Sequence, residues 1–127
     1  MPTTRPQGSL YTRIEGALAT LEFGHPSSNA MNSDLLGRLE RELKSLGENP
    51  DIAVILLCSE GDRAFCAGAS FDELLAVNTA QQSREFFSGF ARVILAMKSC
   101  GKPIVTLVQG KAVGGGVGLI AASDYAL

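Results

Sequence analysis

Hydrophobic residues fall into two kinds of pattern along this chain, and the first kind predicts strands. Residues 18–23 (LATLEF) alternate apolar and polar positions, as a strand with one buried face does. Residues 52–57 (IAVILL) form a short continuous apolar run, which is typical of a parallel strand covered on both faces. Residues 104–108 (IVTLV) supply a further strand.

The second kind of pattern has helical spacing. Asn32 or Ser33 is placed to cap a first helix, which residues 49–50 (Asn-Pro) end. On its outer face Glu40 and Lys44 are four residues apart and can form an ion pair. Its buried face is predicted to consist of five leucines: Leu35, Leu36, Leu39, Leu43 and Leu46.

A second helix is predicted to begin near Thr79 and to stop before Gly101 and Pro103. Because helices separate the predicted strands, we expect right-handed crossovers and an α/β fold class with largely parallel pairing. The apolar face of this helix is predicted to carry Phe86, Phe90, Val93, Ile94 and Met97.

Composition limits the kind of protein. Of the 127 residues, 46% are hydrophobic and the mean hydropathy is +0.17, which is enough for the core of one soluble domain. The 11 basic and 13 acidic residues are mixed along the chain, so we expect no nucleic-acid partner. Residues 1–11 lack a signal-peptide core and no apolar run approaches the roughly 20 residues that span a bilayer, so we expect no membrane partner and a cytoplasmic location.

The cysteines do not predict a metal site. Cys58, Cys66 and Cys100 are an odd number and show neither a C-x-x-C motif nor a Cys/His pairing. This pattern argues against both a disulfide framework and a zinc site, and a reducing compartment fits it. We therefore expect no metal.

Two glycine-containing turns follow buried strands and are the candidate sites of chemistry. Residues 63–71 (RAFCAGASF) are small around Gly68, so the backbone can bend sharply and a ligand can approach its amides. Residues 111–118 (KAVGGGVG) precede residues 119–122, which can open a helix whose free N–H groups favour an anionic oxygen. Two amides that converge on one point would form an oxyanion hole.

Each loop alone has a simpler interpretation, because a glycine cluster after a strand is usually a tight strand-to-helix turn. The triple glycine also lacks the lysine and hydroxyl of a P-loop, and it does not match the G-x-G-x-x-G dinucleotide motif. Nucleotide binding of that kind is therefore disfavoured. The presence of both loops together is what favours an oxyanion site.

Three motifs in order resemble the crotonase, or enoyl-CoA hydratase/isomerase, family. They are Asn29-Ala30-Met31-Asn32, residues 63–69 (RAFCAGA), and residues 110–116 followed by Ala122-Ser123-Asp124. The resemblance extends from Leu18 onward and implies a crotonase-like spiral of ββα turns. Residues 1–127 would then form a single crotonase-like domain that is incomplete, the amino-terminal half of a longer protein.

By this resemblance, the backbone N–H groups of Ala69 and Gly115 hold the oxygen of an acyl-CoA thioester. Gly68, Gly114 and the backbone near Ala67 would contribute to binding the CoA ester, Ala67 by helping to hold the adenine. Coenzyme A would enter only as part of the substrate, with no separate cofactor. The family commonly forms homotrimers or dimers of trimers, so we expect such an assembly.

The sequence departs from the hydratase pattern at one position. Family hydratases place their first catalytic glutamate two positions after the last glycine of the triplet, and this position is Gly118. A glycine cannot transfer a proton, and the second glutamate would lie beyond Leu127. The leading interpretation is an acyl-CoA hydratase or isomerase, with two alternatives: a hydrolase or dehalogenase with a nucleophilic aspartate beyond Leu127, or a noncatalytic fragment that binds CoA esters.

Several reactive side chains have simpler roles. Glu73 and its neighbour Asp72 could face an acyl pocket, but solvated acids in a first helical turn are the expected interpretation. Asp124 is predicted to be a structural hydrogen-bonding group, and His25 a turn residue. Cys66 has no adjacent base, so a thiolate nucleophile is not expected there.

Overall fold

The structure, a computed structural model, describes residues 7–127. Residues 1–6, part of the segment predicted to lack a signal-peptide core, lie outside this range. Within the described range, no helix is long and apolar enough to cross a membrane. The elements occur in the order β1 (Ser9–Glu15), β2 (Leu18–Gly24), α1 (Ser33–Glu48), β3 (Val54–Ser59), α2 (Phe71–Leu75), α3 (Ala80–Ser99), β4 (Ile104–Thr106), α4 (Gly115–Ala121) and β5 (Tyr125–Ala126).

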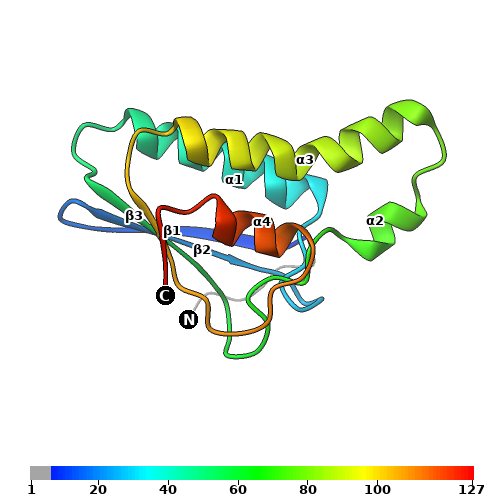
Figure 1. Ribbon diagram of the computed structural model, residues 1–127, viewed down its shortest axis with the longest axis horizontal. Helices are drawn as coiled ribbons and strands as arrows, with labels where there is room; N and C mark the ends of the chain where they lie inside the picture. Colours follow the sequence, from blue (N-terminus) through cyan, green and yellow to red (C-terminus); the bar gives the residue numbers. More distant parts are fainter. Residues whose placement is uncertain (1–6) are drawn as a thin grey trace.

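The five strands form one sheet in the order β1-β2-β3-β4-β5. β1 pairs antiparallel with β2, and every later pair is parallel. This confirms the predicted α/β fold class. Figure 1 shows α1 and α3 side by side over the sheet, while the loops that follow β3 and β4 extend together from its opposite side.

The caps and buried faces predicted for the two long helices are confirmed. Asn32 caps α1, its Oδ1 accepting from the Leu35 N–H at 2.8 Å, and Thr79 caps α3. All five predicted leucines of α1 are buried. The Lys44 Nζ lies 2.8 Å from the Glu40 carboxylate, as expected for the outer face. On α3, Phe86, Val93 and Met97 are buried, whereas Phe90 and Ile94 are half-buried and pack against the core.

The sheet differs from the prediction mainly at β1. Residues 9–15 show no apolar alternation, and most of their side chains are exposed, so the pattern gave no strand signal. The strand forms because its backbone pairs with β2 over seven residue pairs, from Ser9–Gly24 to Glu15–Leu18. The predicted strand at 52–57 begins instead at Val54, and the one at 104–108 ends at Thr106.

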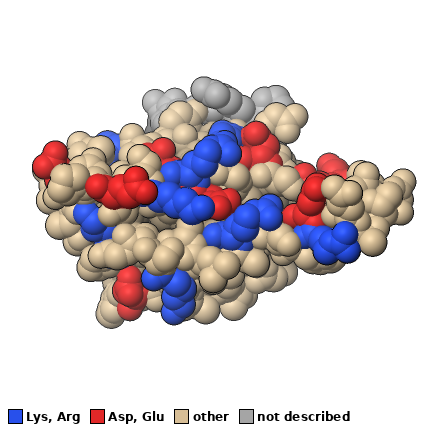
Figure 2. Space-filling view, turned by 90° about the horizontal axis from the view of Figure 1, so that it is seen from above, with Lys and Arg blue, Asp and Glu red and all other residues tan. Residues whose placement is uncertain are grey.

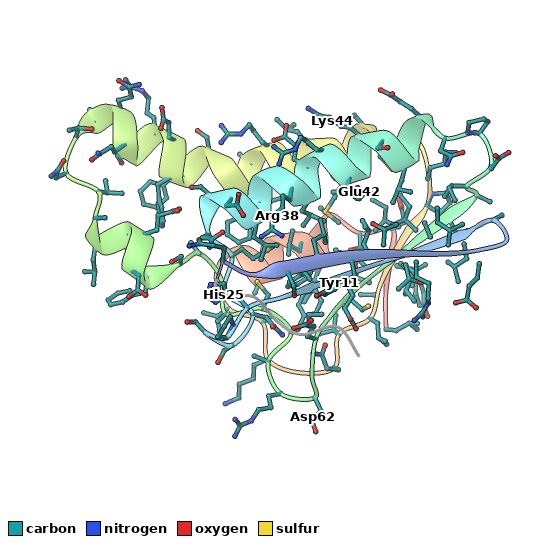
Figure 3. All side chains as sticks on the ribbon, turned by 180° about the vertical axis from the view of Figure 1, so that it is seen from behind. Tyr11, His25, Arg38, Glu42, Lys44 and Asp62 are labelled. Carbon is teal, nitrogen blue, oxygen red and sulfur yellow. The ribbon has the colours of Figure 1, made fainter. Side chains whose placement is uncertain are left out.

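Charges of both signs lie interspersed over the face formed by α1 and α3, as Figure 2 shows from above. Seen from behind in Figure 3, Arg38 and Lys44 lie along α1, and Asp62 marks the far tip of the loop after β3. The absence of a nucleic-acid partner stays a prediction.

Truncation of a buried leucine of α1 should strongly destabilise the protein. Leu43 is 0% exposed, so Leu43→Ala should lower the free energy of unfolding by about 2–5 kcal/mol through lost burial and a residual cavity. Leu95→Ala on α3 is the control, because Leu95 is 66% exposed and its loss should change stability by about 0.5 kcal/mol or less. Urea unfolding of both variants measures the difference, and equal effects would contradict this core assignment.

Candidate functional site

The loops after β3 and β4 are hydrogen-bonded to each other along their length. Cys66 and Ala112 form an isolated parallel bridge. The N–H groups of Phe65 and Cys66 donate to the Lys111 carbonyl at 2.8 and 3.2 Å, and the Val113 N–H donates to the Cys66 carbonyl at 3.0 Å. Two segments far apart in the sequence are thus aligned as a short parallel pair, and this pair places Gly68, the neighbour of Ala69, near Gly115.

Glycine is required where the two loops touch. A side chain at Gly116 would place its Cβ 2.7 Å from the Cys66 carbonyl oxygen, closer than real Cβ atoms come. Gly68 has φ +91°, and a Cβ there would lie 2.9 Å from the Val113 oxygen and 3.7 Å from the Gly115 nitrogen. The absence of side chains at these positions lets the amide-bearing segments approach each other.

The loop that follows β2 orients the Ala69 amide. The Met31 N–H donates to the Gly68 carbonyl at 2.8 Å, and the Met31 carbonyl accepts from the Ser70 N–H at 3.1 Å. Met31 therefore pairs with the peptide groups on both sides of Ala69, in a parallel bridge. Because backbone groups of successive extended residues point to opposite sides, the Ala69 N–H points away from Met31.

Both predicted oxyanion donors are without an acceptor among residues 7–127. The neighbouring amides are used: the Gly68 N–H contacts Cys66 Sγ at 3.4 Å, and the Gly116 N–H donates to Val113 at 3.0 Å. No described residue accepts from the Ala69 N–H or from the Gly115 N–H, which opens α4. Within the described residues both N–H groups remain available as donors, and their convergence on a thioester oxygen stays a prediction.

The three residues predicted to contact CoA lie in the same loops. The Ala67 N–H already donates to the Ser28 carbonyl at 3.2 Å, so the predicted contact with adenine would fall to the Ala67 carbonyl. Gly68 is buried where the loops meet. Gly114 is exposed, and its φ of +55° and ψ of −123° form the bend that starts α4. Binding of a CoA ester by these residues stays a prediction.

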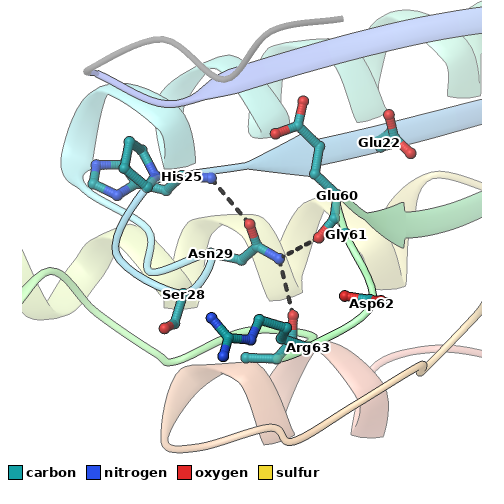
Figure 4. Close-up of a pocket in the computed structure, with 10 residues that line it drawn as sticks. Glu22, His25, Ser28, Asn29, Glu60, Gly61, Asp62 and Arg63 are labelled. Carbon is teal, nitrogen blue, oxygen red and sulfur yellow. Dashed lines mark hydrogen bonds between the residues drawn. The ribbon is translucent and has the colours of Figure 1, made fainter. Parts of the chain in front are cut away.

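Asn29 anchors the base of the first loop, a role that the motif alone did not reveal. Its Nδ2 donates to the carbonyls of Glu60 and Ala64 at 2.9 Å each, and its Oδ1 accepts from the His25 N–H at 3.1 Å, as Figure 4 shows. Asn29 is 6% exposed and has φ +60°, a conformation that asparagine tolerates better than most residues. An asparagine after a turn-rich stretch is the signal that could have indicated this role.

Gln109 supports the same loop from the β4 side. Its Nε2 donates to Ser59 Oγ at 2.9 Å and to the Ala64 carbonyl at 3.3 Å. The Ala64 carbonyl thus accepts from two side chains, one from each neighbouring loop. Gln109 Oε1 is buried without a partner in the described part of the chain.

A cavity of about 400 Å³ lies beside this network. Its lining includes His25, Ser28 and Arg63, together with the carboxylates of Glu22, Glu60 and Asp62 (Figure 4). Arg63 is the one cationic side chain among the described residues that line it. The cavity reaches the first loop at Ala64 and does not include Ala69 or Gly115.

Most of the reactive side chains named in the sequence analysis are buried or form structural hydrogen bonds. Asp124 Oδ2 accepts from the Ile104 N–H at 2.7 Å, as expected of a structural hydrogen-bonding group. Burial raises the pKa of the Cys66 thiol to about 11, which keeps it protonated and disfavours a thiolate nucleophile. Glu73 accepts hydrogen bonds from Ser33, while Asp72 is exposed.

His25 lies in a turn, as predicted. Partial burial lowers the pKa of its imidazole, and the nearby Asp72 carboxylate opposes this effect. The ring is therefore neutral at pH 7, and its Nδ1 accepts from the Ser27 N–H at 3.0 Å. This contact orders the turn that precedes Asn29.

Comparison with known proteins identifies the family. The profile of the family described as "Enoyl-CoA hydratase/isomerase" matches residues 18–127. The chain belongs to the enoyl-CoA hydratase/isomerase, or crotonase, family and corresponds to its amino-terminal region. A crystal structure of an enoyl-CoA hydratase from Mycobacterium smegmatis has the same fold, with a TM-score of 0.86 at 28% identity, and covers 92% of this chain and 46% of its own.

Two curated relatives illustrate the range of activities within this similarity. A peroxisomal Delta(3,5)-Delta(2,4)-dienoyl-CoA isomerase from Arabidopsis thaliana is 32% identical over 107 residues, 76% of this chain and 38% of its own. A mitochondrial 3-hydroxyisobutyryl-CoA hydrolase from Mus musculus is 33% identical over 93 residues, 72% of this chain and 24% of its own. The chain therefore spans less than half the length of these relatives.

The contact between Gly116 and Cys66 can be tested by adding a single methyl group. Gly116→Ala should destabilise the protein by about 1–3 kcal/mol, because the new Cβ overlaps the Cys66 backbone. Gly37→Ala in α1 is the matched control and should stabilise by about 0.5–1 kcal/mol, since its Cβ would meet only the Arg41 guanidinium at 3.4 Å. Thermal unfolding compares them, and an unchanged Gly116→Ala variant would contradict the close loop contact.

Proposed function

We propose that this protein is an acyl-CoA enzyme of the hydratase/isomerase type, in which the N–H groups of Ala69 and Gly115 bind the thioester oxygen. The observation that carries this proposal is that two backbone donors, without acceptors among residues 7–127, lie on loops that hydrogen bonds and glycine contacts hold together. Family membership supports the choice of an acyl-CoA substrate.

The chemistry follows from where negative charge develops. Removal of a proton beside a thioester carbonyl, or addition of a nucleophile to the conjugated double bond, moves charge onto the carbonyl oxygen. Two preorganised donors stabilise that oxyanion more than they stabilise the neutral thioester, so they lower the barrier. The loop hydrogen bonds of Met31 and Cys66 fix the donors before substrate binds, which avoids reorganisation during the reaction.

The proton-transfer group lies elsewhere than at Gly118. This position has no side chain, and a Cβ there would lie 3.1 Å from Ile94 Cδ1 on α3. We infer that a carboxylate outside residues 1–127 moves the proton. The similarity to a dienoyl-CoA isomerase supports a reaction in which a proton is relocated on an enolate.

Hydrolysis is the second candidate function, favoured by Gly118 and by the similarity to a mouse CoA hydrolase. It would use the same oxyanion site, with a nucleophilic aspartate forming an acyl-enzyme. Mass spectrometry of protein quenched during turnover distinguishes the two. A covalent acyl adduct supports hydrolysis, and isomerised or hydrated acyl-CoA without an adduct supports the leading proposal.

We further propose that Arg63, which lines the 400 Å³ cavity, binds a phosphate of CoA. Arg63 and Ser28 both line this cavity (Figure 4), and Arg63 is close in sequence to Ala67 and Gly68, the residues predicted to contact the CoA ester. Guanidinium groups pair well with phosphate because of their planar, multiple donors.

Arg63→Ala should raise the Kd for a CoA ester about three- to tenfold, since charge-assisted hydrogen bonds contribute about 1.5–3 kcal/mol when buried and less when exposed. Affinity for the matching pantetheine thioester, which lacks the nucleotide, should not change. Arg13→Ala on exposed β1 is the control. Calorimetry with both thioesters gives the comparison, and an equal loss for both would exclude phosphate recognition by Arg63.

The Gly115 donor can be removed while the contact of the new Cβ with Phe90 is held constant. Any Cβ at this position would lie about 2.5 Å from the Phe90 ring, so both substitutions are made together with Phe90→Ala. In that background Gly115→Ala keeps the N–H and Gly115→Pro removes it. The proline variant should show kcat about 10²–10³-fold lower than the alanine variant, the effect of losing one oxyanion donor.

The assay is turnover of a short enoyl-CoA by the complete protein, and circular dichroism of both double variants controls for folding. Equal turnover of the two folded variants would rule out Gly115 as a donor.

A further inference from the structure

The short helix α2 follows Ala69 directly and has few contacts of its own. Ser70 caps it, with its Oγ accepting from the Glu73 N–H at 3.3 Å, and none of the residues from Phe71 to Leu75 is buried. A cavity of about 190 Å³ separates it from α3, lined in part by Ser33, Glu73 and Phe86. Packing therefore does little to fix the orientation of α2.

One side chain connects α2 to the body of the protein. Both carboxylate oxygens of Glu73 accept from the Ser33 N–H at 3.1 Å, and Oε1 also accepts from the Ser33 Oγ at 2.6 Å. Within residues 7–127 these are the only side-chain hydrogen bonds from α2 to another element. Ser33 is the first residue of α1, an element whose leucine face is fully buried in the core.

This connection joins the same two segments that already meet at Ala69. Met31 pairs with the peptide groups on either side of Ala69, and two residues later Ser33 pairs with Glu73. Residues 31–33 therefore hold this segment at two points, at Ala69 itself and at Glu73. Without the second point, only the Met31 hydrogen bonds would resist movement of Ser70 and α2, and such movement would shift the Ala69 N–H.

We infer that Glu73 is a positioning residue: by binding Ser33 it holds α2 in the orientation that aims the Ala69 N–H at the thioester oxygen. This inference rests on the proposed function. It also assigns Glu73 a role other than proton transfer, because both of its oxygens are engaged by Ser33 rather than directed to a substrate.

A chromophoric substrate analogue reports the donor geometry directly. The probe is 4-(dimethylamino)cinnamoyl-CoA, a conjugated thioester whose absorbance moves to longer wavelength when its carbonyl oxygen accepts hydrogen bonds. The wild-type protein should produce a red shift on binding. Glu73→Ala should reduce this shift by about half or more, since one of the two donors is misdirected.

Asp72→Ala is the matched control, because it removes the same charge from the same helix and Asp72 is exposed. It should give the full wild-type shift. Glu73→Gln keeps one acceptor oxygen for Ser33 and should restore part of the shift, which a purely charge-based role would not allow. Ser33→Ala should lower the shift less than Glu73→Ala, because the Ser33 N–H remains.

The possible outcomes distinguish failure of the Glu73 positioning role from failure of the proposed oxyanion site. A full red shift in folded Glu73→Ala overturns the positioning role while leaving the oxyanion site in place. An absent shift in the wild-type complex, with binding confirmed by calorimetry, overturns the proposed function and this inference with it. If Glu73→Ala does not fold, the Glu73→Gln variant decides: an unchanged shift contradicts the inference, and a partial shift supports it.

Discussion

The close contact between the loops after β3 and β4 is the constraint on which the candidate site depends. Gly116 lies against the Cys66 backbone, at a separation that no other residue allows, and the hydrogen bonds of Cys66, Lys111 and Val113 hold the two loops in register. Because strands β3 and β4 are parallel neighbours, their following loops leave the sheet at the same edge. The sheet brings the loops together, and the glycines set their distance.

The Ala64 carbonyl extends this constraint to the rest of the fold. It accepts from Asn29, which follows β2, and from Gln109, which follows β4. Three consecutive strands of the sheet thus each contribute a loop to one hydrogen-bonded unit. Preorganised donors are effective catalysts only when the surrounding structure resists their displacement, and this network supplies that resistance. The proposed site consists of backbone groups, so its geometry depends on the loops and not on rotamers.

Much of this architecture could be predicted from the sequence because it follows from local patterns. Residue spacing alone predicts the leucine face of α1, its Asn32 cap and the buried residues of β2. β1 could not be predicted, because its mostly exposed side chains carry no periodic signal and its stability comes from pairing with β2. Ala69 and Gly115 were identified by family resemblance, whereas the contacts of Asn29, Gln109 and Glu73 join segments that are distant in sequence. Local patterns also do not predict the reaction type, since Gly118 shows only that the first glutamate of the family hydratases is absent from this position.

We propose that the Ala69 and Gly115 amides together bind a thioester oxygen, and a crystal structure of the protein with a non-reactive CoA ester tests this most directly. We expect the thioester oxygen to lie about 2.7–3.1 Å from both nitrogens, with the acyl carbon between the two loops. A complex in which this oxygen is bound elsewhere, or contacts neither amide, would contradict the proposal.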